Sequence, residues 1–285
     1  MIPAAFDYTR PSSVDEAVRA LVEAGEDAKV LAGGQSLIPV LRMRLAAPTV
    51  LVDLGGVGDL RGVRDDGDAL VIGATTRHAD VLRDPLVAEH APLLAQAAAT
   101  VADRQVRHLG TVGGSMAHAD PAGDLPAVAV ALDATFEIAG PGGRRTVPAS
   151  EFFVDFLTTV LAPDEVLVAV RVPKRPGWTT HYEKFNRVAQ AWAIVGVAAA
   201  VRRENGDIAE ARVALTNMGT TPLRARGVEE ALAGSAATPE AVASAAARAG
   251  EGADPPSDVV ASADYRRHVA TVLTKRALLA AGGIT

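Results

Sequence analysis

Apolar residues recur along the chain with the periods of helices and of strands, and the order of these patterns predicts the elements. Ser13 and Glu16 form a capping box, a pattern with which helices begin. The apolar residues that follow share one helical face: Val14, Ala17, Val18, Leu21 and Val22. Short apolar runs bounded by turn residues predict strands at 29–32, 49–54, 69–74, 134–140, 165–173, 180–187, 191–202 and 208–217.

Helices are also predicted later in the chain. They lie at 92–102, in an alanine-rich stretch ending near 132, and at 222–232, 239–249 and 264–281. Thr75 or Thr76 can cap a shorter helix, and the glycine- and aspartate-rich stretch 108–128 is expected to be a loop that precedes the alanine-rich helix. Asn205-Gly206 predicts a hairpin between the last two strands.

This order of elements predicts an α+β fold in two domain-sized parts. Helices and strands mix in the first part, whereas antiparallel strands and then helices make up the second. The prolines, glycine and charges of 173–177 indicate a linker. We therefore expect a first domain over residues 1–174 and a second over 175–285.

Composition narrows the function. The 285 residues are 49% hydrophobic, enough for a substantial core. With a net charge of −6 and no basic block, nucleic acid and anionic membranes are poor candidate ligands. The absence of cysteine excludes disulfides and thiolate ligands for iron–sulfur clusters or zinc within the chain. No signal peptide or membrane-length apolar run is visible, so we expect a cytoplasmic protein.

Two glycine pairs with a nearby serine are the strongest candidate for chemistry. Gly33, Gly34 and Ser36 follow a predicted strand, and Gly113-Gly114-Ser115 repeats the device. Without a Cβ, backbone N–H groups can approach an anion closely, and a helix N-terminus favours negative charge. Two such segments are what a pyrophosphate held from both sides requires. The alternative is that both pairs only form tight turns.

Standard nucleotide and hydrolase motifs are absent. Residues 56–61 lack the last glycine of a dinucleotide fingerprint, and the chain contains no Gly-Lys dipeptide for a P-loop. Residues 34–38 miss the final glycine of a nucleophile elbow. No Ser/His/Asp set or carboxylate pair is evident, so we predict no catalytic residue in this chain beyond a bound cofactor.

Histidine and aspartate residues near the second glycine pair allow three interpretations. His118, Asp120 and Asp124 could chelate a metal, stabilise a turn, or accept hydrogen bonds from ribose hydroxyls. Because no second His/Asp cluster reinforces them, we predict no metal site. The scattered remaining histidines, His78, His90, His108 and His268, are expected on surfaces or in turns.

Alternation in the strand around residue 182 places Tyr182, Lys184 and Asn186 on one face. An aromatic ring beside an ammonium suits a planar, electron-accepting ring. A solvated face is the alternative interpretation.

Four segments in this order resemble the FAD-binding medium subunit of molybdenum hydroxylases, the xanthine dehydrogenase family. They are AGGQSL at 32–37, TVGGSMAHADPAGDLPA at 111–127, EVLVAVRVP at 165–173 and YEKFNR at 182–187. Residues 145–153 and 212–225 look most like the aerobic carbon monoxide dehydrogenase branch. Gln35 stands where a histidine can occur in that branch, which puts the subtype in doubt but not flavin binding.

The resemblance implies a two-part FAD-binding fold of vanillyl-alcohol-oxidase type, with subdomains of about 1–56 and 57–174, followed by a C-terminal sheet-and-helix domain. Asp124 would hold the ribose side of FAD, Leu167 would pack by the ring system, and Lys184 would lie near the carbonyl/N5 edge. Tyr182 is added because it shares a face with Lys184. The pyrophosphate would lie between two segments: Ala32, Gly33, Gly34, Gln35, Ser36 and Leu37; and Thr111, Val112, Gly113, Gly114 and Ser115. With no flavin-linking His or Cys motif, we expect FAD to be noncovalent.

The resemblance also implies partners and a role in electron transfer. A small subunit with [2Fe-2S] clusters and a large subunit with the molybdenum cofactor would join this chain in a dimer of heterotrimers. The FAD would pass electrons to an external acceptor such as quinone, and any membrane contact would be made through partners. Carbon monoxide is the preferred substrate of the large subunit. The alternatives are a nicotine, quinoline, aldehyde or purine hydroxylase, a self-contained flavin oxidoreductase, or a nucleotide-binding scaffold.

Overall fold

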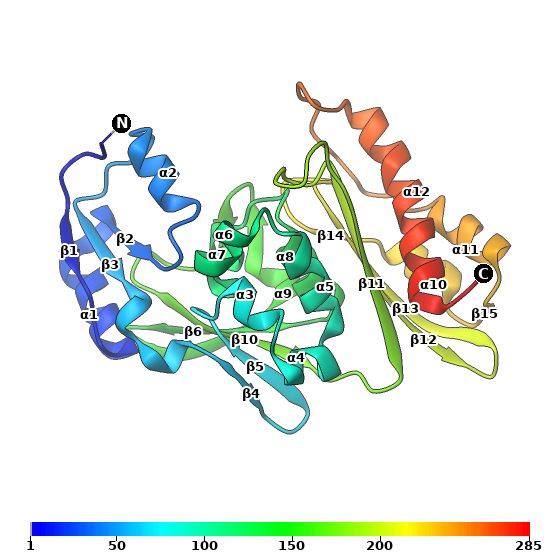
Figure 1. Cartoon of the computed structure of the whole chain (residues 1–285), viewed down its shortest axis with the longest axis horizontal. Helices are drawn as coiled ribbons and strands as arrows, with labels where there is room; N and C mark the ends of the chain where they lie inside the picture. Colours follow the sequence, from blue (N-terminus) through cyan, green and yellow to red (C-terminus); the bar gives the residue numbers. More distant parts are fainter. Residues whose placement is uncertain (1) are drawn as a thin grey trace.

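The computed structural model describes residues 2–285, in which three main sheets follow one another along the molecule (Figure 1). The first sheet, near the N-terminus, is parallel, with the strand order β1 (Asp7–Thr9), β3 (Val50–Asp53), β2 (Ala28–Leu31). The second is antiparallel, with the order β4 (Val63–Asp65), β5 (Ala69–Gly73), β10 (Val166–Pro173), β6 (Thr135–Gly140), β7 (Gly143–Pro148).

The third sheet is the predicted antiparallel meander. Its order is β11 (Trp178–Phe185), β12 (Val195–Glu204), β13 (Asp207–Thr216), β14 (Leu223–Arg224), and β15 (Ser235–Ala236) also pairs with β13. The predicted hairpin joins β12 to β13, with Asn205 and Gly206 both in the left-handed region that such a turn requires. A separate small hairpin pairs β8 (Phe153–Asp155) with β9 (Thr158–Thr159).

Helices cover the sheets and fill the space between them. They are α1 (Val14–Ala24), α2 (Leu37–Arg42), α3 (His78–Val81), α4 (Pro85–His90), α5 (Pro92–Thr100), α6 (Arg104–Leu109), α7 (Val112–His118), α8 (Asp124–Ala131), α9 (Ala149–Phe152), α10 (Arg226–Leu232), α11 (Pro239–Ala246) and α12 (Ala263–Gly282). Short 3-10 turns lie at Gly25–Asp27, Leu54–Gly56 and Gly58–Leu60. No helix in residues 2–285 is long and apolar enough to cross a membrane.

Helix α1 begins as its capping box predicts. The Ser13 hydroxyl accepts the Glu16 N–H at 3.2 Å, and the Glu16 carboxylate accepts the Ser12 N–H at 2.8 Å. Its buried face is narrower than predicted, because Val22 is 52% exposed. The other four apolar residues of that face pack the helix against the first sheet and the back of the second.

Helix α8 is the centre of the main core. Every one of its residues is buried, as expected for a helix that is apolar on all sides. It shares a core with α5 and with a cluster of three phenylalanines, Phe136, Phe152 and Phe153, of which Phe136 lies on β6 of the second sheet. Ala198 and Ala214 of the third sheet belong to the same core. The two larger sheets are therefore joined through one continuous apolar core. A second core fills the space between the third sheet and α10–α12.

Several short elements differ from the sequence-based expectation. Thr75 and Thr76 cap no helix; their hydroxyls donate to the carbonyls of Leu60 and Gly62, and α3 begins only at His78. The predicted helix at 222–232 starts with a strand, and the predicted strand at 191–202 begins only at Val195. The unpredicted elements, including β1, β4, β7, α4 and α6, are short or largely polar, so their hydrophobic periodicity is weak.

The stretch predicted to be a loop is mostly helical. Helix α7 starts at Val112 because the Thr111 hydroxyl caps it, accepting the Gly114 N–H at 3.1 Å. The chain then turns at residues 119–123 and enters α8 at Asp124. The prediction was wrong because the low helix propensity of two glycines outweighed, in the sequence pattern, a cap that precedes them.

Asp133, just beyond α8, is a second junction between the sheets. Its carboxylate is paired with Arg175 at 2.6 Å, Arg212 at 2.7 Å and Arg224 at 2.8 Å. The indole ring of Trp178 lies under two of these guanidinium groups, those of Arg175 and Arg212. Arg175 belongs to the predicted linker, so this segment is a short connector anchored at its basic side chain.

We expect Asp133→Asn to lower the free energy of unfolding by about 1–3 kcal/mol, because three arginines lose their shared charged acceptor. Asparagine tolerates the left-handed backbone of residue 133, whose φ is 50°, so the effect isolates the charge. Urea unfolding measures it. Asp207→Asn, at an exposed carboxylate with no side-chain partner within residues 2–285, is the matched control. If both variants are equally stable, the ion pairs of Asp133 with the three arginines do not stabilise the fold.

Candidate functional site

The first glycine segment joins β2 to α2. Gly34 has a φ of +72°, a conformation that favours glycine. A Cβ at Gly33 would collide with the Leu109 carbonyl oxygen and lie 2.8 Å from the Gly110 Cα. Ser36 is the N-cap residue of α2, as predicted, and its hydroxyl caps no N–H there.

The second glycine segment is the first turn of α7 and not the predicted loop. Gly113 donates its N–H to the Ala74 carbonyl at 2.8 Å, and a Cβ there would lie 2.5 Å from the Ala74 Cβ. At Gly114 a Cβ would lie 2.7 Å from the Thr111 hydroxyl, which caps the helix. Residue 113 is glycine because its backbone packs closely against Ala74, just after β5. Residue 114 is glycine because a side chain there would collide with the Thr111 hydroxyl that caps α7.

The two segments meet. Gly33 contacts the backbone of residues 109–110, which leads directly into Thr111 and α7. Both segments thus lie at one junction between the first and second sheets, where the loop before α2 meets the connection from α6 to α7 (Figure 1). Glycine at this contact, two helix starts and two serine hydroxyls provide the close backbone approach and donors that a pyrophosphate requires. The residues present fit the phosphate part of FAD.

His78 lies beneath the second segment, although the sequence analysis expected it on a surface or in a turn. It is only 3% exposed, and its backbone N–H donates to the Gly110 carbonyl at 3.0 Å. Its Nε2 lies 3.4 Å from the Ser115 hydroxyl, while Nδ1 is buried without a partner within residues 2–285. Burial lowers the pKa of His78 to about 4, with a further contribution from the Arg107 guanidinium, so the ring is neutral at pH 7.

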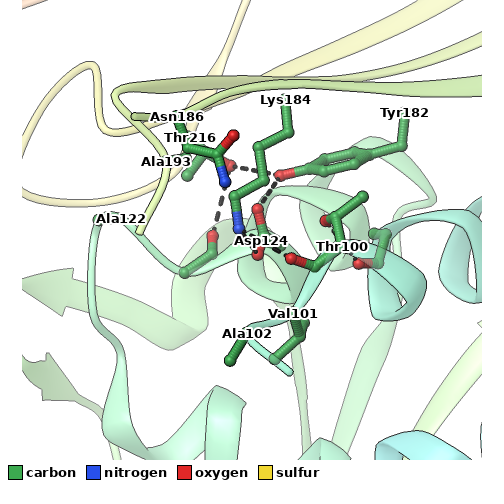
Figure 2. Close-up of polar contacts among 12 residues, drawn as sticks. Thr100, Val101, Ala102, Ala122, Asp124, Tyr182, Lys184, Asn186, Ala193 and Thr216 are labelled. Carbon is green, nitrogen blue, oxygen red and sulfur yellow. Dashed lines mark hydrogen bonds and ion pairs between the residues drawn. The ribbon is translucent and has the colours of Figure 1, made fainter. Parts of the chain in front are cut away.

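Tyr182 and Lys184 share one face of β11, as predicted, and both reach Asp124 at the start of α8 (Figure 2). The Tyr182 hydroxyl donates to Asp124 Oδ1 at 2.7 Å, and the Lys184 ammonium donates to Oδ2 at 2.7 Å. The ammonium also donates to the Thr100 carbonyl at 3.1 Å. Asn186 lies beyond the strand and donates to the Val188 carbonyl at 2.9 Å, so it does not join this group.

This group is almost completely buried. The side chains of Asp124 and Lys184 are 3% and 5% exposed. Burial raises the pKa of the Asp124 carboxyl, and the Lys184 ammonium acts in the opposite direction. Burial and the neighbouring carboxylate raise the pKa of Tyr182 well above its usual value, so the phenol keeps its proton. Since both oxygens of Asp124 accept bonds within the protein, its predicted contact with ribose stays a prediction.

The remaining predicted residues have simpler surroundings. Leu167 is buried in the main core on β10, paired in register with Ile138. Asp120 stabilises a turn, because its Oδ1 accepts the Ala122 N–H at 2.8 Å, and His118 lies 3.9 Å away from its carboxylate. Within the part of the chain that the structure describes, no three His, Asp or Glu side chains gather to hold a metal ion.

A cavity of about 740 Å³ is lined on one side by the turn at residues 120–122. Its walls are mostly apolar and include Pro121, Trp192, Ile194 and Pro256, with the buried Arg266 behind them. A pocket of this size and character accommodates a small organic molecule.

The fold and the paired glycine segments define a class, the flavoproteins that hold FAD between two subdomains. Comparison with known proteins agrees. Residues 4–175 match the family described as FAD binding domain in molybdopterin dehydrogenase, and residues 180–281 match the CO dehydrogenase flavoprotein C-terminal domain.

Relatives resemble the chain over nearly its full length. The carbon monoxide dehydrogenase medium chain of Hydrogenophaga pseudoflava is 44% identical, covering 99% of this chain and 98% of the relative. The 6-hydroxypseudooxynicotine dehydrogenase complex subunit alpha of Paenarthrobacter nicotinovorans is 38% identical, covering 98% and 95%. A solved structure of carbon monoxide dehydrogenase from Hydrogenophaga pseudoflava aligns with a TM-score of 0.97 at 45% identity, covering 99% of each chain.

The chain belongs to the family of FAD-binding medium subunits of molybdenum hydroxylases, which includes the carbon monoxide dehydrogenase flavoproteins. It is an FAD-carrying oxidoreductase subunit, and the predicted fold class, cofactor and general function are confirmed. The metal centres of such enzymes lie in partner subunits, in agreement with the absence of cysteine from this chain.

We expect His78 to make folding stability pH-dependent. Because the folded state holds the neutral ring, its contribution is complete above pH 6.5 and is lost as the pH falls from 6.5 to about 4. The free energy of unfolding lost over this pH range through His78 amounts to about 3 kcal/mol. Urea unfolding between pH 7 and pH 4 measures it, and His78→Gln, which cannot be charged, should lose this part of the pH dependence. The exposed His108→Gln control should keep it; identical profiles for wild type and His78→Gln would refute the assignment.

Proposed function

We propose that this chain binds FAD noncovalently at the junction of the two glycine segments and serves as the electron outlet of a molybdenum hydroxylase. The observation that carries the proposal is the contact of Gly33 with the backbone of residues 109–110, which brings both segments to one place. Bound FAD supplies the electron-accepting chemistry. The protein supplies position, exclusion of water and fixed dipoles.

Each part of the site has a proposed role. Residues 32–37 and 111–115 hold the pyrophosphate, with the hydroxyls of Ser36 and Ser115 as donors. The neutral His78 lies next to Ser115 and restricts that side chain. Lys184 faces the carbonyl/N5 edge of the flavin, with Tyr182 beside it, while Leu167 and Asp124 line the ring and ribose sides.

We also propose a domain boundary at about residue 174, with a first domain over 1–174 and a second over 175–285. The four-residue connection between β10 and β11 and the limits of the two family matches support it. Within the first domain, the parallel sheet ends at Asp53 and the antiparallel one begins at Val63, in support of subdomains of about 1–56 and 57–174.

The proposed partners are a small iron–sulfur subunit and a large molybdenum subunit, arranged as a dimer of heterotrimers in the cytoplasm. A subunit without cysteine cannot hold a thiolate-bound iron–sulfur cluster, so a cluster that relays electrons to its flavin lies in another chain. The proposed acceptor is a quinone-type molecule. The apolar cavity next to the turn at 120–122 supports this class of acceptor, since its walls are mostly apolar and the turn that lines it leads directly into Asp124.

The substrate that we propose for the complex is carbon monoxide, which the large subunit would oxidise with water to carbon dioxide. The 44% identity to a carbon monoxide dehydrogenase medium chain supports it. The second candidate is an N-heterocycle hydroxylase, favoured by the relative at 38% identity, whose name refers to an oxynicotine compound, and by Gln35.

Removing either site hydroxyl should weaken FAD binding. Ser36 caps no N–H, so Ser36→Ala should not affect folding, whereas the stability of Ser115→Ala has to be checked by urea unfolding because its hydroxyl lies beside the buried His78. We expect Ser36→Ala and Ser115→Ala each to raise the dissociation constant of FAD about threefold to tenfold, the value of one hydrogen bond. Flavin fluorescence titration measures it, and the exposed Ser150→Ala is the control. Acid precipitation should release the flavin into the supernatant. An unchanged affinity for FAD in both variants would show that the pyrophosphate does not bind at this junction. Flavin that stays with the precipitated protein would refute noncovalent binding.

The isolated chain should not oxidise any of the candidate substrates, because it contains no cysteine and the molybdenum cofactor belongs to the proposed large subunit. The purified native complex should reduce a dye or a soluble quinone under carbon monoxide. Turnover with a nicotine derivative, quinoline or purine but not with carbon monoxide would replace the substrate and leave the flavin role intact. Turnover by the isolated chain would contradict both.

A further inference from the structure

Lys184 is the only cation in the group that it forms with Tyr182 and Asp124, and most of its bonding capacity is already used. Two of the three ammonium protons are donated to Asp124 and to the Thr100 carbonyl. One proton is therefore left for a ligand.

The Asp124 carboxylate is fixed in position by hydrogen bonds, as the Lys184 ammonium is. Asp124 occupies the first position of α8, where the helix dipole favours a carboxylate. Its two oxygens accept from different residues, Tyr182 and Lys184, so the carboxylate has little freedom to rotate.

Gly196 creates the space for this arrangement. It pairs with Lys184 in the register of β11 and β12, and a Cβ at Gly196 would lie 2.5 Å from the Tyr182 hydroxyl. Thr216 on β13 closes the other side, with its hydroxyl 3.5 Å from that of Tyr182. The third sheet therefore fixes the phenol in the one place from which it reaches Asp124.

The electrostatic consequence is a buried pair with no net charge. In an interior of low dielectric constant, an unpaired ammonium would impose a strong positive potential on its surroundings. A carboxylate 2.7 Å away cancels most of that potential and leaves a polarised donor.

We propose that Asp124 and Tyr182 are positioning residues that offset the charge of Lys184, so that the flavin meets a hydrogen-bond donor without a net positive charge. The group thereby keeps the reduction potential of bound FAD below the value that a lone ammonium would set. This inference rests on the proposed function, because it requires Lys184 to face the flavin.

A redox titration of the FAD-loaded chain against a reference dye at pH 7 tests the proposal. Asp124→Asn keeps the shape of the side chain and removes the negative charge. It should favour the reduced flavin about tenfold or more, which corresponds to a rise of about 30 mV for a two-electron couple. Lys184→Met should shift the potential downward, and the double variant should return close to wild type.

A second pair of variants tests the role of Tyr182 without altering either charge. Tyr182→Phe and Gly196→Ala both take the phenol away from Asp124, and both should raise the potential, because the carboxylate is then no longer held in place and offsets the ammonium charge less well. Gly219→Ala is the matched control, since a Cβ there would have only the Thr221 carbonyl within 4 Å, at 3.7 Å. If Asp124→Asn does not fold, these two variants decide the question.

The outcomes separate this inference from the proposed function. A wild-type chain that binds no FAD refutes the proposed function itself. FAD bound normally, with a potential lowered by Lys184→Met but unchanged or lowered in Asp124→Asn, refutes only the charge offset. A potential unchanged in both variants refutes the proposed position of Lys184 beside the flavin. Asp124→Glu, which restores a carboxylate, should bring the potential back toward wild type and would contradict the proposal if it behaved like Asp124→Asn.

Discussion

Helix α8 is buried on every side, and the rest of the structure depends on how its two charged ends are held. Asp124 begins the helix and is bound by Lys184 and Tyr182, whereas Asp133 follows it and is bound by three arginines. All of these partners except Arg175 come from the third sheet, and the helix packs on β12 and β13 of that sheet and on α5, while the second sheet shares the same apolar core (Figure 1). An apolar helix thus fixes the distance between two sheets, and its terminal carboxylates fix their relative position. A buried charge without its partner is costly, so this arrangement tolerates little sliding.

The glycines of the site serve the protein at least as much as the ligand. Gly33 and Gly113 are glycine because backbone from another segment occupies the place of a Cβ. These contacts bring two helix starts, those of α2 and α7, to one junction. The proposed pyrophosphate site rests on that close packing, because it brings the helix starts, with their unpaired N–H groups, to one junction.

The division of labour within the family follows from the same structure. On the proposed function, a chain with two pyrophosphate-binding segments and a neutral polar group near the flavin serves any partner that delivers electrons. Relatives named for carbon monoxide and for an oxynicotine compound share nearly the full length of this chain. The substrate is thus a property of the partner, whereas electron acceptance is a property of this fold.

The sequence by itself determined the α+β order of elements, the hairpin at Asn205-Gly206, the capping box of α1, the two glycine segments, and the shared face of Tyr182 and Lys184. Each depends on residues close together in the chain, where periodicity, caps and turn preferences act. Only the tertiary structure decided that His78 is buried, that Gly113 packs against Ala74, and that Asp124 is the partner of Lys184. Those facts depend on segments about forty to sixty residues apart, such as residues 124 and 184, which meet only when the sheets pack on α8. Burial, and with it the charge state of a histidine or a carboxylate, is a property of that packing and has no local signature in the sequence.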